Sequence, residues 1–335
     1  MSTPLVISLP QGVRDILPEE SGRITAVESA ILSVFARFGY QKVITPLLEY
    51  MDSLALGMGG DLNERVMKFI DPATGKVVAI RPDITPQIAR IAATKMKDYP
   101  LPLKLCYNAN VLRGVEKGGG AKSELLQIGA ELITARPSPE ADAEMIIMAI
   151  ESLMAAGVKA FKIDVGDVGF LKGVLDRLDV GAAGRKTIMA LIAAKDSSGL
   201  EAAIDEIDVK KKIKPSDRKL LVNLTTFYGE DEVIEKARGL VTDPALCAGL
   251  DRMHNVLDII SKKGYKSSVT IDLGEVRGID YYTGIIFEGF ASGAGRPIMS
   301  GGRYDTLLEK YGYTAAATGF AFDVENIVAS LARGA

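Results

Sequence analysis

The most informative scarcity in this 335-residue chain is histidine, which occurs once, at His254. That residue lies in the helical pattern LDRMHNVLDII, with no cysteine, Asp-His or Glu-His grouping nearby. This excludes a histidine-based catalytic triad, a two-histidine metal site and a zincin. We therefore expect no catalytic group of these kinds, no bound metal and no cofactor.

Cysteines and long apolar runs are also scarce. Cys106 and Cys247 are too few and too far apart for a disulfide framework or a metal set, which fits a reducing compartment. The longest apolar stretches, such as 145–150, are broken well short of the roughly 18 residues that a membrane span needs. The first fifteen residues, MSTPLVISLPQGVRD, show no export signal. We expect a cytoplasmic protein without a membrane partner.

An excess of positive charge is absent as well, because the formal net charge is -3. Proteins that bind the phosphate backbone normally show a basic stripe. One basic cluster, defined by Lys210, Lys211, Lys212, Lys214, Arg218 and Lys219, departs from this pattern. Contact with nucleic acid or an acidic partner stays open, but a solvated helix end is favoured because no aromatic residue is interleaved. The glycine-rich stretches GMGGD (57–61) and EKGGGAKS (116–123) lack phosphate-loop spacing and read as flexible loops.

The remaining pattern predicts an α+β fold, because most strands are joined by loops or hairpins rather than by crossover helices. Helices are expected at 20–38, 84–96 and 138–156, with a last one from Val324; strands are expected at 76–83, 101–113, 124–134, 268–273, 282–290, 297–300 and 317–322. Segment 40–50, interrupted by Pro46, suits an edge strand or an interface. We predict an antiparallel sheet flanked by helices, formed by residues 1–169 and 264–335, with a helical insertion at 170–263.

The strand ELLQIGAELIT (124–134) suggests a binding surface. Alternation places Gln127, Gly129 and Glu131 on one face and apolar residues on the other. The amide and the carboxylate lie about 13 Å apart along the strand, and the glycine between them would leave floor space for a small ligand. A merely solvated face would also explain the polar residues, although not the central glycine.

Two arginines suggest what such a ligand carries. Arg113 ends the partner strand, and Arg277 precedes a tyrosine pair in EVRGIDYYTG (275–284). Guanidinium groups bind carboxylates bidentately, and Asp83 or Glu131 could take an amino group or a basic side chain. This combination predicts a zwitterionic ligand. A surface turn or a buried strand with paired charges are the other interpretations of the 275–284 segment.

Several motifs together resemble the catalytic core of histidyl-tRNA synthetase. They are QGVRDILP (11–18), GYQKVITPLLEY (39–50), RPDITPQIAR (81–90), LR (112–113), ELLQIGAEL (124–132), VRGIDYYTG (276–284) and GGRYD (301–305). The resemblance covers nearly the whole chain apart from the insertion and implies a class II aminoacyl-tRNA synthetase-like fold. It also implies a histidine-binding set of nine residues: Asp83, Thr85, Arg113, Gln127, Glu131, Arg277, Tyr281, Tyr282 and Tyr304. In this set Asp83 and Thr85 meet the α-amino group, whereas Glu131 and Tyr282 hold the imidazole.

The chain departs from the synthetase pattern where that pattern contacts ATP and tRNA. The last glycine-rich strand resembles GFAIGVERL but reads GFAFDVENI, with Asp323 for the glycine and Asn326 for the arginine that grips phosphates. A neutral amide and an added carboxylate should weaken ATP binding. The loop after Arg113 is also altered, with Val115 at a glutamate position, and no anticodon-binding domain is expected after Ala335.

These losses are similar to those of ATP phosphoribosyltransferase regulatory subunits, a synthetase-like family of histidine biosynthesis. The resemblance implies a non-catalytic chain that supports a short-form catalytic subunit in a hetero-oligomer, expected to be a hetero-octamer, and takes part in feedback by free histidine. It also implies a homodimer through the strand around Pro46, and no tRNA partner. The alternative is a truncated synthetase-like enzyme that activates histidine with ATP.

Overall fold

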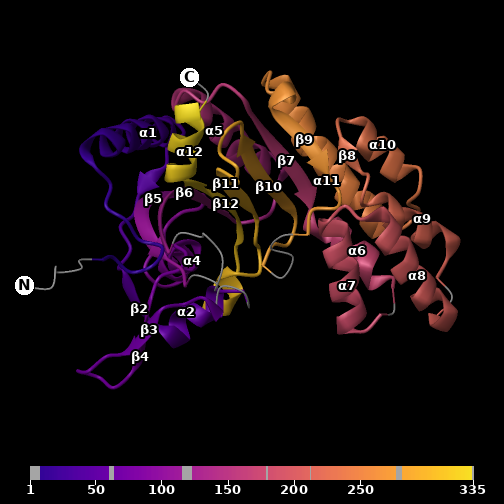
Figure 1. Ribbon diagram of the computed structural model, residues 1–335, viewed down its shortest axis with the longest axis horizontal. Coiled ribbons are helices and arrows are strands. Elements are labelled where there is room, and N and C mark those ends of the chain that lie inside the picture. The colour runs from indigo at the N-terminus through magenta and orange to yellow at the C-terminus, as the bar shows by residue number, and fades with distance from the viewer. Residues whose placement is uncertain are drawn as a thin grey trace, which may run out of the picture.

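The computed structural model describes residues 8–59, 64–114, 123–178, 180–211, 213–276 and 281–333. These residues build a main sheet whose strands follow the order β1-β5-β6-β12-β11-β10-β7-β9-β8 (Figure 1). The strands are β1 (Gln41–Lys42), β5 (Leu103–Leu112), β6 (Glu124–Thr134), β7 (Phe161–Asp167), β8 (Tyr228–Gly229), β9 (Val269–Asp272), β10 (Ile285–Ala291), β11 (Met299–Arg303) and β12 (Ala316–Asp323). A small second sheet has the order β2-β4-β3, from β2 (Leu48–Tyr50), β3 (Lys68–Ile70) and β4 (Val77–Ile80).

The predicted antiparallel sheet is confirmed at the centre and corrected at the edges. From β5 to β7 every neighbouring pair is antiparallel, including the predicted β5–β6 hairpin. The outer pairs β1–β5 and β7–β9 are parallel. A parallel pair needs a long crossover connection, and the chain between β7 and β9 supplies one through its helices. Strand β7 is absent from the sequence prediction, as are β3 and the short helix α2 (Met51–Gly57).

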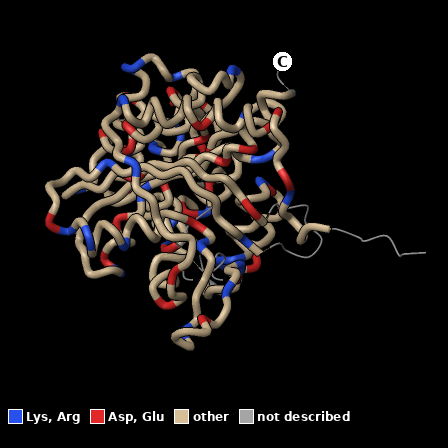
Figure 2. Tube along the Cα trace, turned by 90° about the vertical axis from the view of Figure 1, so that its left-hand side faces the viewer, with Lys and Arg blue, Asp and Glu red and all other residues tan. Residues whose placement is uncertain are grey.

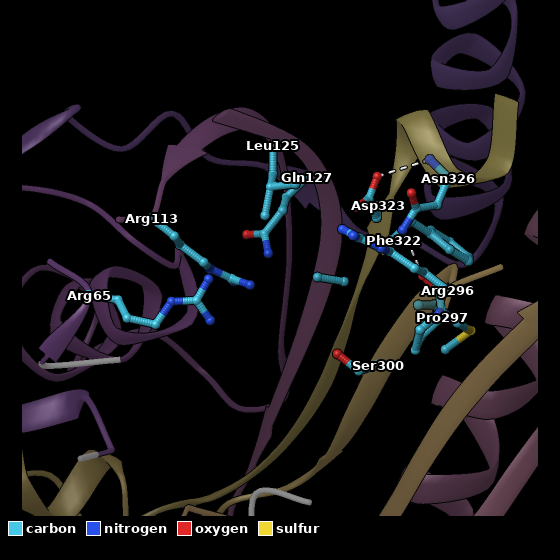
Figure 3. A pocket seen from close by; sticks show the side chains of 12 residues that line it. Arg65, Arg113, Leu125, Gln127, Arg296, Pro297, Ser300, Phe322, Asp323 and Asn326 are labelled. Carbon is cyan, nitrogen blue, oxygen red and sulfur yellow. Dashed lines mark hydrogen bonds between the residues drawn. The ribbon is translucent and has the colours of Figure 1, made fainter. Parts of the chain in front are cut away.

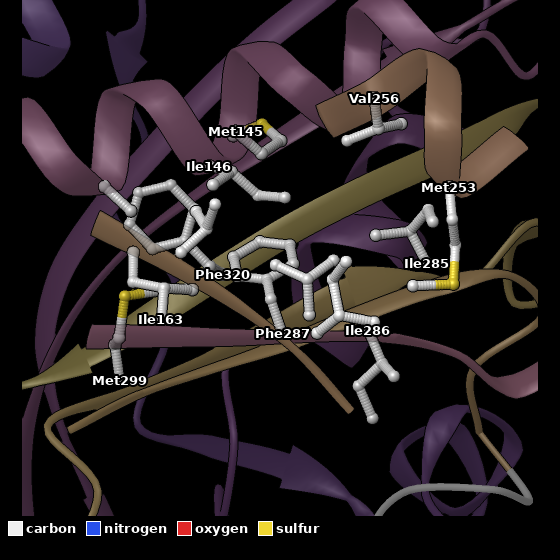
Figure 4. Close-up of a cluster of buried hydrophobic side chains, with 14 of the residues drawn as sticks. Met145, Ile146, Ile163, Met253, Val256, Ile285, Ile286, Phe287, Met299 and Phe320 are labelled. Carbon is white, nitrogen blue, oxygen red and sulfur yellow. The ribbon is translucent and has the colours of Figure 1, made fainter. Parts of the chain in front are cut away.

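Helices cover both faces of the main sheet. One face carries α1 (Pro18–Arg37), α5 (Pro139–Ala155), α11 (Pro244–Lys262) and α12 (Val324–Arg333), and the other carries α4 (Thr85–Thr94) and the 3-10 turn η2 (Leu308–Tyr311). Figure 4 shows Met145 and Ile146 of α5 above Phe320 of the sheet, and Met253 of α11 beside Ile285. Burying these side chains removes apolar surface from water, which is the main stabilising contribution of this layer.

Two helix ends show how the sequence sets the element boundaries. The Ser138 hydroxyl accepts the Ala141 N–H at 3.2 Å and caps α5, as its position before Pro139 predicts. Helix α1 stops before Gly39, whose φ of +85° is the left-handed conformation that glycine adopts without strain. Segment 40–50 splits at Pro46 into β1 and β2, because proline cannot donate to a sheet ladder.

The described part of residues 170–263, predicted as a helical insertion, carries five helices and most of a sixth. These are α6 (Val168–Asp176), α7 (Ala182–Ala193), α8 (Ser197–Lys211), α9 (Pro215–Asn223), α10 (Glu232–Arg238) and α11, and most lie together to one side of the sheet (Figure 1). Strand β8 from the same span pairs with β9, and α11 packs on α5. The span thus shares both a sheet edge and a helix layer with the rest, so its division at 170 and 263 stays a prediction.

Charged residues of the two signs are interspersed along the chain (Figure 2). Within the basic cluster, Arg218 pairs with Asp205 at 2.6 Å, and the neighbouring Asp217 accepts from Arg177 at 2.9 Å. Lys212 lies outside the described residues. Pairing of Arg218 across α8 and α9 is what a solvated helix end would show, and it favours that interpretation of the cluster.

Candidate functional site

A cavity of about 280 Å³ lies on the α4 side of the main sheet. It is lined by Gly57, Asp83, Thr85, Pro86, Arg113, Gln127, Glu131, Tyr281, Tyr282, Ser300, Tyr304, Gly319, Phe320 and Ala321. Eight of the nine predicted histidine-binding residues are in this set, and the ninth, Arg277, lies outside the described residues. The volume is near the lower end of the roughly 300–1,000 Å³ usual for ligand pockets, so the cavity suits a small molecule.

One end of the cavity is organised around the Glu131 carboxyl, which is buried in β6. Thr85 donates its hydroxyl hydrogen bond to Glu131 at 2.7 Å, Tyr107 donates at 3.3 Å, and Tyr304 donates to the other carboxyl oxygen. Burial raises the pKa of Glu131 to about 8, since an ionised carboxyl loses solvation there, although the hydroxyl donors oppose this shift. At neutral pH this end therefore holds a proton within reach of a ligand. Sequence reasoning missed Tyr107, whose position in a regular strand pattern carries no signal.

Glycines create the space for Glu131, but not in the way the sequence predicts. The absent side chain of Gly129 does not leave a ligand floor, because a Cβ there would lie 2.3 Å from the Tyr107 hydroxyl oxygen. The glycine that makes room in the cavity is Gly319 of β12, which pairs with Glu131 of the neighbouring strand β6. A Cβ at Gly319 would lie 1.6 Å from the Glu131 Oε2 atom. The prediction of open space over Gly129 is therefore wrong, since only the fold reveals which side chain fills it.

The other end of the cavity joins a carboxyl, an amide and a guanidinium group. The Gln127 amide, in the orientation that satisfies both neighbours, donates to Asp83 at 3.2 Å and accepts from Arg113 at 3.1 Å. Arg113 also lies 3.8 Å from Asp83 and donates to the Pro82 carbonyl at 2.8 Å. Burial raises the pKa of Asp83, and the Arg113 guanidinium opposes that rise. This end of the cavity therefore presents an acidic group, Asp83, and a basic group, Arg113, both hydrogen-bonded to the Gln127 amide.

Three tyrosines form the wall between these ends. The rings of Tyr281 and Tyr282 meet edge to face with centroids 5.1 Å apart, and Tyr281 lies 5.5 Å from the Tyr304 ring. Among the described residues, the Tyr281 hydroxyl is buried and has no hydrogen-bond partner. A buried hydroxyl without a partner is costly, so this group is a candidate to bond a ligand. The Tyr-Tyr segment is thus part of a cavity wall rather than a surface turn.

The GGRYD motif (301–305) holds this wall in place. A Cβ at Gly302 would lie 2.8 Å from the Tyr282 ring, so the glycine lets that ring lie close over β11. Arg303 is buried and pairs with Asp142 at 2.8 Å and with Asp305 at 2.9 Å. These ion pairs anchor the end of β11, from which Tyr304 reaches Glu131.

A second cavity of about 350 Å³ adjoins the first and shares Arg113, Gln127, Ser300 and Ala321 with it. Figure 3 shows Arg65 and Arg113 on one side, with Arg296, Asp323 and Asn326 on the other. Sequence reasoning missed Arg65 and Arg296, because both lie outside the strand pattern and the quoted motifs. The altered loop at 115–122 lies outside the described residues.

The two substitutions that distinguish this cavity from the synthetase pattern stabilise the start of α12. The Asp323 carboxylate accepts the Asn326 backbone N–H at 3.0 Å, and the Asn326 amide donates to the Pro297 carbonyl at 2.9 Å. Both side chains thus bond within the protein at the position where a phosphate-binding arginine is expected.

Two other kinds of feature are absent from the described residues. In that part of the chain no helix is long and apolar enough to cross a membrane. The same residues contain no group of three or more side chains suited to hold a metal ion.

Comparisons with known proteins agree with this fold. The family model described as histidyl-tRNA synthetase matches residues 12–327. The ATP phosphoribosyltransferase regulatory subunit of Geobacter sulfurreducens is 43% identical over 331 residues, covering 99% of this chain and 74% of that protein. The crystal structure of an ATP phosphoribosyltransferase regulatory subunit/histidyl-tRNA synthetase from Bacillus halodurans has a TM-score of 0.89 at 31% identity, covering 99% of this chain and 84% of that one. Histidyl-tRNA synthetase from Nostoc shares the fold, with a TM-score of 0.81 at 20% identity and coverage of 98% and 76%. The chain therefore belongs to the histidyl-tRNA synthetase-like family, and within it to the ATP phosphoribosyltransferase regulatory subunits.

Proposed function

We propose that this chain is a non-catalytic regulatory subunit that binds free histidine in the first cavity. It assembles with a short-form ATP phosphoribosyltransferase catalytic subunit in the cytoplasm and supports the first step of histidine biosynthesis. Histidine that binds one state of the complex more tightly than another biases the catalytic subunits toward that state.

The observation that carries the proposal is the chemistry of the two cavity ends. At one end of the cavity, Asp83 can accept a hydrogen bond from the α-amino group of histidine, and Arg113 can donate to its carboxylate. At the other end, Glu131 faces an imidazole nitrogen. The proton held by Glu131 lets it donate to a neutral imidazole, or pair with an imidazolium after transferring that proton. The Tyr281 hydroxyl and the tyrosine rings suit a small planar ring between these ends.

Calorimetric titration of histidine into the isolated chain and into the complex tests this proposal. Glu131→Ala should weaken binding by about 10- to 100-fold, the usual effect of losing a charge-assisted hydrogen bond. Glu140→Ala, in the first turn of α5, is the matched control and should bind as the parent chain does. Absence of heat in both samples would leave a structural scaffold without a histidine site.

The proposed assembly has its own test. The chain is tagged at its native locus, purified gently and examined by mass spectrometry for co-purifying proteins. A short phosphoribosyltransferase should be present, with a native mass that fits a hetero-octamer. Bound tRNA without that partner would instead favour the synthetase-like enzyme.

Three arginines, Arg65, Arg113 and Arg296, line the second cavity and would favour an anionic ligand there. They motivate the alternative function, a synthetase-like enzyme that activates histidine with ATP. Against ATP activation, Asn326 replaces the phosphate-binding arginine and is bonded to Pro297. We expect histidine-dependent exchange between ATP and pyrophosphate to stay at background. Exchange well above that level would overturn the non-catalytic assignment.

A further inference from the structure

The helical span that follows β7 touches the tyrosine wall directly. Lys172 of α6 donates from its Nζ atom to the Tyr282 carbonyl at 3.0 Å. Four residues earlier, the Val168 N–H donates to the Gly284 carbonyl at 2.9 Å. Helix α6 therefore contacts the backbone at both ends of the 282–284 segment.

The same segment is held from its other side by β11. The Thr283 N–H donates to the Arg303 carbonyl at 2.7 Å, and the Thr283 hydroxyl accepts the Asp305 N–H at 3.0 Å. The backbone that carries the Tyr282 side chain is thus held by hydrogen bonds to both the sheet and α6. Its ring has little freedom unless one of these two supports moves.

The start of α6 is itself fixed to α11. The buried Asp167 carboxylate accepts the Phe170 N–H at 2.7 Å and pairs with Arg252 of α11 at 3.3 Å. Helix α11 also packs on α6 at Gly249, where a Cβ would lie 3.4 Å from the Phe170 Cβ, an ordinary contact distance. A shift of these two helices relative to the sheet would therefore carry Lys172 with it.

We propose that Lys172 is a positioning residue that couples the α6–α11 packing to the ligand affinity of the cavity through the Tyr282 backbone. Lys172 is not among the side chains that line the cavity, so its effect passes through Tyr282. By reciprocity, a partner that shifts α6 would change ligand affinity, and a bound ligand would change how firmly α6 is held. The ligand part of this inference rests on the proposed histidine function, whereas the coupling to the 282–284 backbone does not.

The first measurement is histidine affinity of the Lys172→Met chain by calorimetry. Methionine keeps an unbranched, flexible side chain but cannot donate to the carbonyl. Loss of the hydrogen bond from Lys172 to the Tyr282 carbonyl should weaken histidine binding by about 3- to 10-fold. Lys172→Arg, which retains donors, should restore most of the affinity.

Lys162→Met is the matched control, because Lys162 of β7 also donates to a backbone carbonyl, that of Ser267, at 2.6 Å. It should leave histidine affinity unchanged. Parent affinity in Lys172→Met would overturn the proposal. So would a melting temperature that falls clearly below that of Lys162→Met, since Lys172 would then act on overall stability.

Hydrogen exchange of the ligand-free chain separates this inference from the histidine proposal. Lys172→Met should speed amide exchange in peptides that contain residues 282–286, and Lys162→Met should not. If the parent chain binds no histidine, faster exchange still supports the positioning role, and unchanged exchange overturns it.

Discussion

Individual residues shape the cavity through pairs in which one partner is large and the other has no side chain. Glu131 occupies the space that Gly319 leaves, the Tyr107 hydroxyl lies over Gly129, and the Tyr282 ring lies over Gly302. In the first two pairs the glycine belongs to the strand next to that of its partner, and in the third Gly302 of β11 faces the segment that leads into β10. The polar groups are therefore placed by close backbone approach across the sheet as well as by their own hydrogen bonds.

Gly319→Ala tests this pairing. The added methyl group must displace the Glu131 carboxyl, so we expect loss of histidine binding and about 1–3 kcal/mol of destabilisation from overpacking. Gly22→Ala in α1 is the control, because no atom lies within 4 Å of a Cβ there. It should raise stability by about 0.5–1 kcal/mol through helix propensity. Urea denaturation of both variants measures the difference, and similar stability in the two would contradict the pairing.

The raised pKa of Glu131 predicts a pH dependence of stability. The folded state holds this proton up to about pH 8, whereas the ordinary pKa is near 4.5. Between these values the folded state binds more protons than the unfolded chain, so stability falls as pH rises, by up to about 1.4 kcal/mol per pH unit. Glu131→Gln should remove this contribution and gain stability relative to the parent chain from pH 5 to 8. Glu140→Gln serves as the control in the same unfolding series; parallel curves for all three chains would refute the assignment.

At the level of elements, the junction of β12 and α12 carries the clearest departure from the synthetase pattern. Asp323 ends the strand that pairs with β6 and caps the helix that follows. A carboxylate at this position satisfies a helix N–H and interacts favourably with the helix dipole. The second cavity thus borders a helix start whose first turn is already bonded within the chain.

Asp323→Ala should therefore lower the stability of the folded chain by about 1 kcal/mol, the usual effect of losing a cap. Asp323→Asn should cost less, since asparagine is an equally good capping residue. Chemical denaturation distinguishes the two. Equal destabilisation by alanine and asparagine would mean that the charge, and not the cap, is what Asp323 contributes.

Across the whole molecule, the small sheet is the region where apolar side chains are most exposed. Eight of the fourteen exposed large apolar residues in the described part of the chain fall between positions 44 and 77: Ile44, Leu47, Leu48, Tyr50, Leu56, Phe69, Ile70 and Val77. The sheet projects away from the main body at the end opposite the helical span (Figure 1). Exposed apolar surface is typical of interfaces, and the resemblance implies a homodimer through the strand around Pro46, so we propose that a second copy of the chain covers this surface.

Ile70→Lys tests this homodimer, because Ile70 is 68% exposed on β3. A charge buried between two copies has no partner, so the variant should elute with the mass of a monomer in light scattering. Met154→Lys on α5, at a position 55% exposed, should keep the mass of a dimer. A dimeric Ile70→Lys chain would place the interface elsewhere.

The sequence by itself determined the central antiparallel strands other than β7, the ends of α1 and α5, and eight of the fourteen residues that line the first cavity. Alternation and helix capping are local properties, and the quoted motifs carry a family resemblance that the comparisons confirm. The tertiary structure alone decided that Tyr107 fills the space over Gly129, that Gly319 makes room for Glu131, and that Arg65 and Arg296 reach the second cavity. These facts depend on which strands are neighbours and how closely their backbones approach, and contacts between residues far apart in the chain leave no periodic signal in its order.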